Sequence, residues 1–120
     1  MKPKIDKTKF GSMTIAGKKY EHDLIIRLDG KVEKRKKKLS KEIFGTSHTI
    51  SLAEAEYVYE NGVEQLIIGA GQQGMVKLSD EASAFLQEKH CAVEIFPTPE
   101  AIIHWNEAKG ATIGLFHVTC

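Results

Sequence analysis

The chain has 120 residues, 42% of them hydrophobic and 28% charged, a size and composition typical of a single globular domain over residues 1–120. A formal net charge of +1 excludes a global attraction to polyanions, so any electrostatic attraction must come from local clustering. With two cysteines, Cys91 and Cys120, and no apolar run near the roughly 20 residues of a membrane helix, we expect a cytoplasmic protein without a disulfide framework.

The N-terminal third is expected to form antiparallel hairpins. Residues 12–15 and 18–21 flank Ala16 and Gly17, and residues 24–28 lead into Asp29 and Gly30. Two-residue connections of this kind between β-prone segments are the strongest short-range hairpin signal.

A run of basic residues follows the second turn. Residues 31–41 hold seven basic residues and one acid. Such a run is typical of a solvated edge strand or loop, since lysines on an exposed edge discourage pairing with other sheets. It is also compatible with a docking patch for an acidic partner or nucleic acid, although no aromatic residue interleaves the run to stack on bases. The candidate partner-binding residues are Lys34, Arg35, Lys36, Lys37 and Lys38.

Helices and strands alternate in the rest of the chain. Ser51 and Glu54 have the spacing of a capping box, and Ser79 and Thr98 are expected to cap two further helices. Strands are expected at residues 66–68, 91–96 and 111–118, with a short extended piece at 75–78. The predicted fold class is therefore α/β (α+β), a layered domain with a mixed central sheet in which N-terminal antiparallel hairpins precede an αβαβαβ order.

Three glycines follow the apolar run at residues 66–68. Gly69, Gly71 and Gly74 have the spacing of a dinucleotide-binding fingerprint. Four residues separate Gly74 from the cap at Ser79, however, and acids occupy the first turn of the next helix, where they would repel a phosphate. We therefore expect the glycines to serve a tight turn and close packing, and we predict no cofactor.

The other polar residues form no catalytic set. Five histidines are scattered without paired metal-ligand spacing, so no metal site and no catalytic residue is predicted. His48 lies in a glycine-containing loop, where side chains often bind ligands. If a small ligand binds in the cleft beside Gly69, Gly71 and Gly74, His48 and Asn106 would supply polar contacts to it.

Several separated stretches together resemble one family. They are Gly45-Thr46-x-His48, the strand exit at residues 66–71, Thr98 with the following Trp105-Asn106, and the segment at residues 114–120. They resemble the adipogenesis-associated MTH-type domain proteins, and a mitochondrial complex I assembly factor is similar too. The resemblance implies an α/β fold with a mixed central sheet, and roles in adipocyte differentiation or respiratory-complex assembly.

Two functions are compatible with these observations. The first is a non-enzymatic protein-interaction or assembly module that binds an unidentified protein partner through the basic run and His48. The second is a small-ligand or nucleotide-binding protein, or an enzyme acting on such a ligand, that uses the cleft beside the three glycines. The sequence does not decide whether the protein is an enzyme, and nucleic-acid binding has the least support.

Overall fold

The computed structural model describes residues 2–120. Its strands are β1 (Ile5–Lys9), β2 (Ser12–Ile15), β3 (Lys18–Tyr20), β4 (Leu24–Ile26), β5 (Val32–Lys34), β6 (Thr49–Ile50), β7 (Gln65–Ala70), β8 (Lys77–Leu78), β9 (Ala92–Phe96) and β10 (Thr112–His117). Its helices are α1 (Lys38–Phe44), α2 (Leu52–Val58), α3 (Asp80–Glu88) and α4 (Thr98–Glu107). Within residues 2–120, no helix is both long enough and apolar enough to cross a bilayer.

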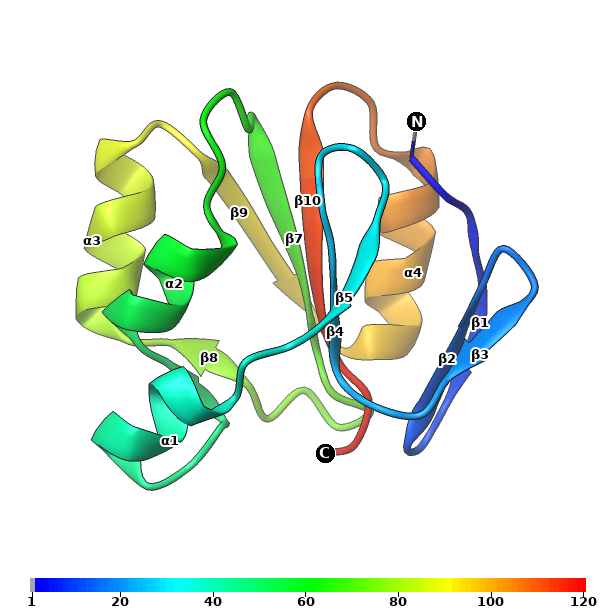
Figure 1. Ribbon diagram of the computed structural model, residues 1–120, viewed down its shortest axis with the longest axis horizontal. Coiled ribbons are helices and arrows are strands. Elements are labelled where there is room, and N and C mark those ends of the chain that lie inside the picture. Colours follow the sequence, from blue (N-terminus) through cyan, green and yellow to red (C-terminus); the bar gives the residue numbers. More distant parts are fainter. Residues whose placement is uncertain (1) are drawn as a thin grey trace.

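A five-stranded sheet in the order β5-β4-β10-β7-β9 forms the centre of the molecule (Figure 1). Strands β10, β7 and β9 are parallel, whereas β4 is antiparallel to β10 and β5 is antiparallel to β4. The prediction of a mixed sheet is confirmed. The middle strand is β10, and every one of its six residues is buried, which agrees with its apolar sequence.

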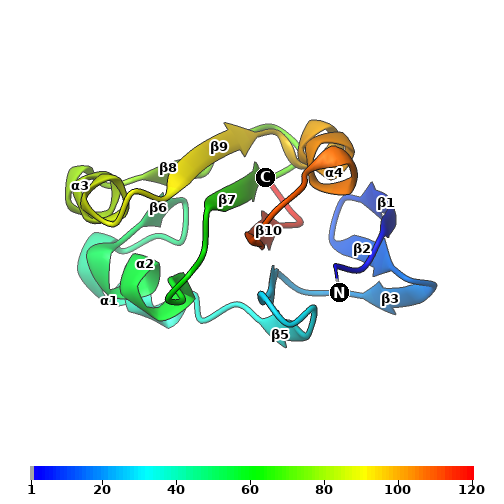
Figure 2. The same ribbon diagram turned by 90° about the horizontal axis from the view of Figure 1, so that it is seen from above.

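Two apolar cores lie on opposite faces of this sheet. Helices α2 and α3 cover one face, and α4 together with the small β1-β2-β3 sheet covers the other (Figure 2). Side chains alternate between the two cores along each strand: Ile25 faces α2 and α3, whereas Leu24 and Ile26 face α4. The layered arrangement expected from the sequence is therefore present.

Both predicted hairpins form. Ala16 and Gly17 have φ values of 48° and 83°, the positive values that a tight two-residue turn between antiparallel strands requires. Strands β4 and β5 pair antiparallel around the turn at Asp29 and Gly30. The N-terminal β1-β2-β3 sheet is antiparallel, as expected.

The helix caps follow the sequence only in part. Ser51 and Ser79 cap α2 and α3, because their side chains accept hydrogen bonds from the backbone N–H groups of Glu54 and Ala82. The reciprocal half of the capping box is absent, since the Glu54 side chain points to Arg35 instead. The prediction that Thr98 caps α4 was wrong. Pro97 is the N-cap, and the Thr98 hydroxyl donates to the His117 carbonyl oxygen instead.

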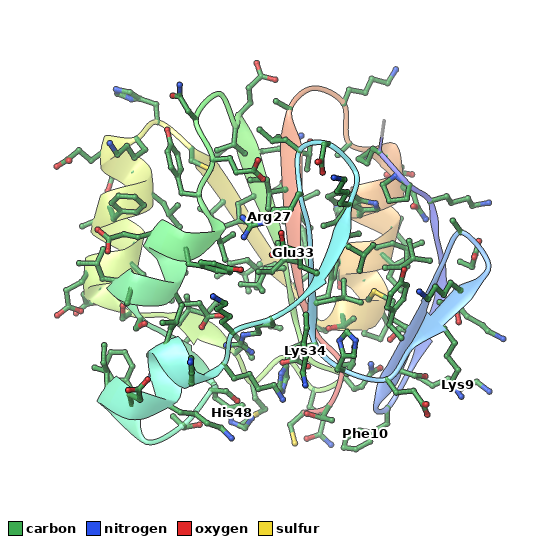
Figure 3. The ribbon with its side chains drawn as sticks, in the orientation of Figure 1. Lys9, Phe10, Arg27, Glu33, Lys34 and His48 are labelled. Atoms are coloured by element: carbon green, nitrogen blue, oxygen red, sulfur yellow. The ribbon has the colours of Figure 1, made fainter. Side chains whose placement is uncertain are left out.

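Arg27 fastens the carboxyl end of α2 to the sheet. Its guanidinium donates to the carbonyl oxygens of Tyr57 and Val58 at 3.2 and 3.0 Å. The same group is paired with Glu33 on β5, with 3.1 Å between Nε and Oε2, and both side chains lie in the middle of the view in Figure 3. Basic groups at this end of a helix satisfy its last carbonyls.

One helix has no clear signal in the sequence. Helix α1 begins inside the basic run, with no side-chain hydrogen bond at its N-cap Lys37 and no acid in its first turn. It ends at Gly45, which has φ 70°. Because local capping does not start this helix, its position depends on packing of Ser40 against α2, described below.

Candidate functional site

A pocket of about 600 Å³ opens at the end of the molecule where β10 finishes. Three segments line it, together with Gly11. They are residues 21–23 before β4, residues 34–38 from the end of β5 to the start of α1, and residues 118–119 after β10. Because β4 and β5 run antiparallel, the start of one and the end of the other meet at this edge, beside the carboxyl end of β10. The sheet therefore brings the basic run next to the residues that follow its central strand.

Arg35 forms a buried cluster of charges beneath the pocket. Its Nε donates to Glu54 Oε2 at 2.6 Å and its Nη2 donates to Glu54 Oε1 at 3.0 Å, while Nη1 donates to Asp23 Oδ2 at 3.0 Å. The side chains of all three are at most 1% exposed. Burial lowers the pKa of Arg35, but the hydrogen bond and charge of Glu54, followed by those of Asp23, raise it above its usual value.

Two serines complete the surroundings of Glu54. The Ser40 hydroxyl donates to Glu54 Oε1, and the Ser51 hydroxyl donates to the Leu39 carbonyl oxygen at 2.7 Å. The Ser51 backbone N–H, which a capping box would direct to Glu54, donates to Ser40 Oγ at 3.0 Å. Helix α1 is thus attached to α2 through hydroxyl groups, and Glu54 is free to pair with Arg35.

Asp23 connects Arg35 to the end of β10. Its Oδ1 accepts a hydrogen bond from the Val118 backbone N–H at 2.9 Å, and its Oδ2 lies 2.6 Å from His117 Nδ1 and 3.6 Å from Lys37 Nζ. Burial raises the pKa of Asp23, but the hydrogen bonds from His117 and Val118 and the charges of His117 and Lys37 outweigh burial and lower it to about 2. Asp23 is therefore ionised at neutral pH.

His117 and His48 lie together at this end of the molecule. Their rings meet edge to face, with 5.3 Å between centroids. His117 is buried and half-buried His48 covers it, so the loop residue predicted to bind a ligand is adjacent to the charge cluster. On the other side of the His117 ring, Nε2 lies 3.1 Å from Thr119 Oγ1.

The basic run divides into one buried and four accessible residues. Arg35 is 4% exposed and belongs to the cluster, whereas Lys34, Lys36 and Lys38 are exposed and Lys37 is half-buried. All five line the pocket. Among the ion pairs formed within residues 2–120, only that of Lys37 with Asp23 involves one of these four lysines. Figure 3 places Lys34 and His48 at the same end of the molecule.

A large apolar side chain stands beside the pocket. Phe10 is 67% exposed in the turn between β1 and β2, next to the pocket residue Gly11, and Figure 3 shows it at the same end as Lys34. The backbone there is anchored, because the Gly11 N–H donates to the Val118 carbonyl oxygen at 2.7 Å. An aromatic side chain and a basic pocket are therefore presented on one surface.

The amides of the glycine turn are already occupied. The N–H groups of Gln72 and Gln73 donate to the carbonyl oxygens of Thr119 and Cys120 at 2.6 and 3.0 Å. Gly71 N–H donates to Thr98 Oγ1, and Gly74 N–H donates to the Gly71 carbonyl oxygen. A phosphate-binding turn needs backbone N–H groups that are free to donate to the phosphate. Here these groups donate to the segment after β10 and to neighbouring residues instead.

Two of the three glycines are needed for close packing. A Cβ on Gly69 would lie 2.7 Å from Phe116 Cδ1 and 2.9 Å from Thr98 Oγ1. Gly71 has φ +97°, and a Cβ there would overlap the Cys120 backbone. These contacts agree with the structural role predicted for the glycines.

Asn106 lies away from the other candidate ligand-binding residues. It is near the carboxyl end of α4, whereas Gly71 contacts Thr98 at the amino end of that helix. Its side chain accepts from the Ile5 N–H and donates to the Ile5 carbonyl oxygen, both at 2.9 Å. Asn106 therefore holds β1 against α4 and is not brought together with His48 or the glycine turn.

Neither cysteines nor metal-ligand clusters add to the site. Cys91 is buried, and burial raises the pKa of its thiol. Residues 2–120 contain no group of three or more His, Cys, Asp or Glu side chains arranged to hold a metal ion.

Sequence reasoning missed the central members of the site, which are Asp23, Glu54, His117 and Thr119. Glu54 was assigned only to a helix cap, and Asp23 received no role. The available signal was the position of His117 and Thr119 at the carboxyl end of an apolar strand, where ligands collect in open α/β sheets.

Known proteins match the chain over nearly its whole length. A family model described as "Protein of unknown function (DUF498/DUF598)" matches residues 5–112. The crystal structure of the conserved hypothetical protein PH1505 from Pyrococcus horikoshii OT3 is 34% identical, with a TM-score of 0.91 over 98% of this chain and 99% of that one. A structure named MT938 is 31% identical, with a TM-score of 0.84 over 98% and 99% of the two chains.

More distant structures share the fold. A crystal structure of a Bordetella parapertussis protein is 15% identical, with a TM-score of 0.75 over 97% of this chain and 95% of that one. The names of PH1505 and MT938 state no activity, so the adipogenic and assembly roles of the resembled family remain predictions for this chain.

Proposed function

The chain belongs to the DUF498/DUF598 family of proteins of unknown function, and on that premise we propose that it is a protein-interaction or assembly module that binds an acidic segment of a partner protein. The basic pocket is the binding site. The observation that carries the proposal is that Lys34, Lys36 and Lys38 are exposed and line one pocket, above an arginine whose charge Asp23 and Glu54 already neutralise.

Charge and shape together support an acidic polypeptide as the occupant. The exposed lysines at the alternate positions 34, 36 and 38 can meet carboxylates spaced along an extended chain, and electrostatic complementarity of this kind speeds and orients association. Phe10 offers an apolar contact beside the lysines, and aromatic anchors of this type contribute much of the binding free energy at interfaces. We therefore expect the bound segment to combine several carboxylates with at least one apolar side chain.

A fluorescent oligo-glutamate peptide ending in leucine tests the proposal. The triple variant K34E/K36E/K38E should weaken binding by about tenfold or more, because an exposed ion pair contributes up to about 1 kcal/mol and about 1.4 kcal/mol is a factor of ten. Lys37 is left unchanged because it contacts Asp23. The substitution F10A should weaken binding without changing its dependence on salt.

The control carries the same change in net charge at another place. Lys31, Lys89 and Lys109 are exposed and lie outside the pocket, so K31E/K89E/K109E should bind the peptide like the unmodified protein apart from a small long-range effect. Equal binding by both triple variants, or equal weakening of both, would remove the pocket from consideration. If the protein binds single-stranded DNA in preference to the peptide, the partner is a nucleic acid and not an acidic protein segment.

A small-ligand-binding protein is the second candidate function. The pocket volume is in the range of small-molecule sites, and His48 lies at the same end of the molecule. The glycine turn contributes less to this candidate, because its amides are hydrogen-bonded within the protein. Native mass spectrometry of freshly purified protein distinguishes the two: a retained small anion that K34E/K36E/K38E loses would favour the second function.

A further inference from the structure

Asp23, His117 and Thr119 form a continuous line of hydrogen bonds that the proposed function does not use. Asp23 Oδ2 lies 2.6 Å from His117 Nδ1, and His117 Nε2 lies 3.1 Å from Thr119 Oγ1. Asp23 immediately precedes β4, His117 is the last residue of β10, and Thr119 lies in the segment after β10.

The position of the proton on His117 follows from these distances. Two acceptors cannot lie 2.6 Å apart without a proton between them, and Asp23 is ionised, so Nδ1 carries the hydrogen and donates it to Asp23. In the neutral ring, Nε2 is then an acceptor and receives the Thr119 hydroxyl hydrogen. A hydroxyl, an imidazole and a buried carboxylate in this order are the arrangement that activates an oxygen nucleophile.

The carboxylate is held more firmly than a lone hydrogen bond would hold it. The Val118 N–H donates to Asp23 Oδ1 at 2.9 Å, and Arg35 Nη1 donates to Oδ2 at 3.0 Å. These bonds fix the orientation of Asp23 and keep it charged, so they fix the tautomer of His117. Asp23 and Arg35 are thus positioning residues for the imidazole.

Only the hydroxyl end of the line is suited to meet a substrate. His117 is 3% exposed, whereas Thr119 is half-buried and lines the basic pocket. His117 is not among the residues that line the pocket, so a group bound there contacts Thr119 and not the imidazole, as expected if the hydroxyl is the nucleophile and the imidazole its base.

We propose that Thr119 is an acyl-accepting nucleophile and that the pocket hydrolyses small acyl esters bearing a carboxylate. Thr119 Oγ1 forms a bond to the carbonyl carbon while its proton passes to His117 Nε2. The bond from that carbon to the leaving alcohol oxygen then breaks, and His117 returns the proton to the alcohol. Water hydrolyses the Thr119 ester by the same steps, so no oxidant or cofactor is consumed.

The lysines give the substrate class. A carboxylate on the acyl group pairs with Lys34, Lys36 or Lys38, which line the pocket. Ester hydrolysis is a function beyond the proposed binding of an acidic partner segment. It uses the same basic pocket, but it does not require that a partner protein binds there.

Mass spectrometry after treatment with para-nitrophenyl acetate and para-nitrophenyl succinate tests it. We expect an ester on Thr119 that hydroxylamine removes, whereas acyl groups on lysines are amides and remain. Thr119→Val keeps the shape of the side chain and should lower release of nitrophenol by about a hundredfold, the scale of general-base catalysis. Thr119→Ser should restore it.

The control is Thr8→Val. Thr8 is also half-buried, but its hydroxyl donates to the Ser12 carbonyl oxygen and no histidine faces it, so this change should leave ester formation unaltered. Acylation confined to lysines, or an equal rate in Thr119→Val, would overturn the proposal. His117→Gln removes the base, and if that variant fails to fold, the valine and serine variants still decide the question.

The binding of an acidic segment and the nucleophilic role of Thr119 can be tested independently. K34E/K36E/K38E should lose the oligo-glutamate peptide and the preference for the succinate ester, yet retain acetylation of Thr119, because the acetyl ester carries no charge for the lysines to bind. If this variant loses peptide binding but is still acetylated, the lysines bind carboxylates and are not needed for the attack by Thr119. If the peptide binds but no ester forms on Thr119, only the proposal that Thr119 is a nucleophile is contradicted.

Discussion

Glu54 aligns both oxygens of its carboxylate with the guanidinium of Arg35, at 2.6 and 3.0 Å, in a pair that solvent does not reach. Fork-to-fork pairs of this kind are the strongest ion pairs in proteins, and breaking one of them leaves a buried charge without its partner. The pair links the basic run to α2 and holds the floor of the pocket.

Replacing Glu54 should therefore destabilise the protein strongly. We expect Glu54→Gln to lower the free energy of unfolding by about 3 kcal/mol, because Arg35 keeps only Asp23 as a charged partner. Urea denaturation followed by circular dichroism measures the change. Glu56→Gln, on the exposed side of the same helix, is the control and should change stability by no more than about 0.5 kcal/mol. Similar losses in both variants would contradict the importance of the pair.

Stability should fall in acid because of Asp23. The pKa of Asp23 is about 2 in the folded protein and 3.8 for an unperturbed group, so the unfolded chain takes up the proton first. This carboxylate stabilises the fold fully above about pH 5, and its contribution, roughly 2 kcal/mol, is lost as pH falls toward 2. Titration of the Asp23 carboxyl carbon by NMR gives the folded value directly. A midpoint near 4 would contradict the hydrogen bonding described for this group.

Two glycines with similar backbone angles should respond differently to alanine. Gly62 has φ +93° and open space around its Cα, so Gly62→Ala should cost only the backbone strain, about 1 kcal/mol. Gly71 has φ +97° but lies against the Cys120 backbone, so Gly71→Ala should cost clearly more. Thermal unfolding of the two variants measures the difference. Equal costs would show that the segment after β10 does not pack tightly on the turn.

Asn106 should act on the fold and not on binding. Asn106→Ala removes both side-chain hydrogen bonds to Ile5 and should lower the free energy of unfolding by about 1–2 kcal/mol. Hydrogen exchange of the β1 amides should accelerate, while affinity for the oligo-glutamate peptide should stay the same. Asn61→Ala, at an exposed position, is the control. A loss of peptide affinity in Asn106→Ala would show that this residue contributes to binding after all.

The two cysteines should differ in reactivity. Cys91 is 6% exposed and its pKa is raised by burial, whereas Cys120 is half-buried beside the glycine turn. Because the thiolate is the reacting form, iodoacetamide at mildly alkaline pH should label Cys120 well before Cys91. Peptide mapping over time measures the order, and prior labelling of Cys91 would contradict the burial of this residue just before β9.

Local sequence signals were sufficient for most of the fold. The hairpin turns at Ala16-Gly17 and Asp29-Gly30 and the caps at Ser51 and Ser79 act over a few residues, so they can be recognised without knowledge of the rest of the chain. Helix α1 could not be recognised, because it has no cap signal and depends on hydrogen bonds from Ser40 to residues of α2.

The charge cluster depends on contacts that the sequence does not reveal. Arg35 stands in a run of lysines, and nothing in the run distinguishes the residue that turns inward. Its partners Asp23 and Glu54 lie 12 and 19 positions away and meet it only once the sheet and α2 are packed. The same holds for Thr98, which was predicted to cap α4 but donates a hydrogen bond to the carbonyl oxygen of His117, 19 positions away.

The position of β10 has a consequence during protein synthesis. This strand follows all the others in the chain and yet lies between β4 and β7. While a ribosome is still translating residues 112–117, the facing edges of β4 and β7 are unpaired and neither apolar core can close. The nascent chain therefore carries two open strand edges, which can pair with other chains, until β10 has been synthesised.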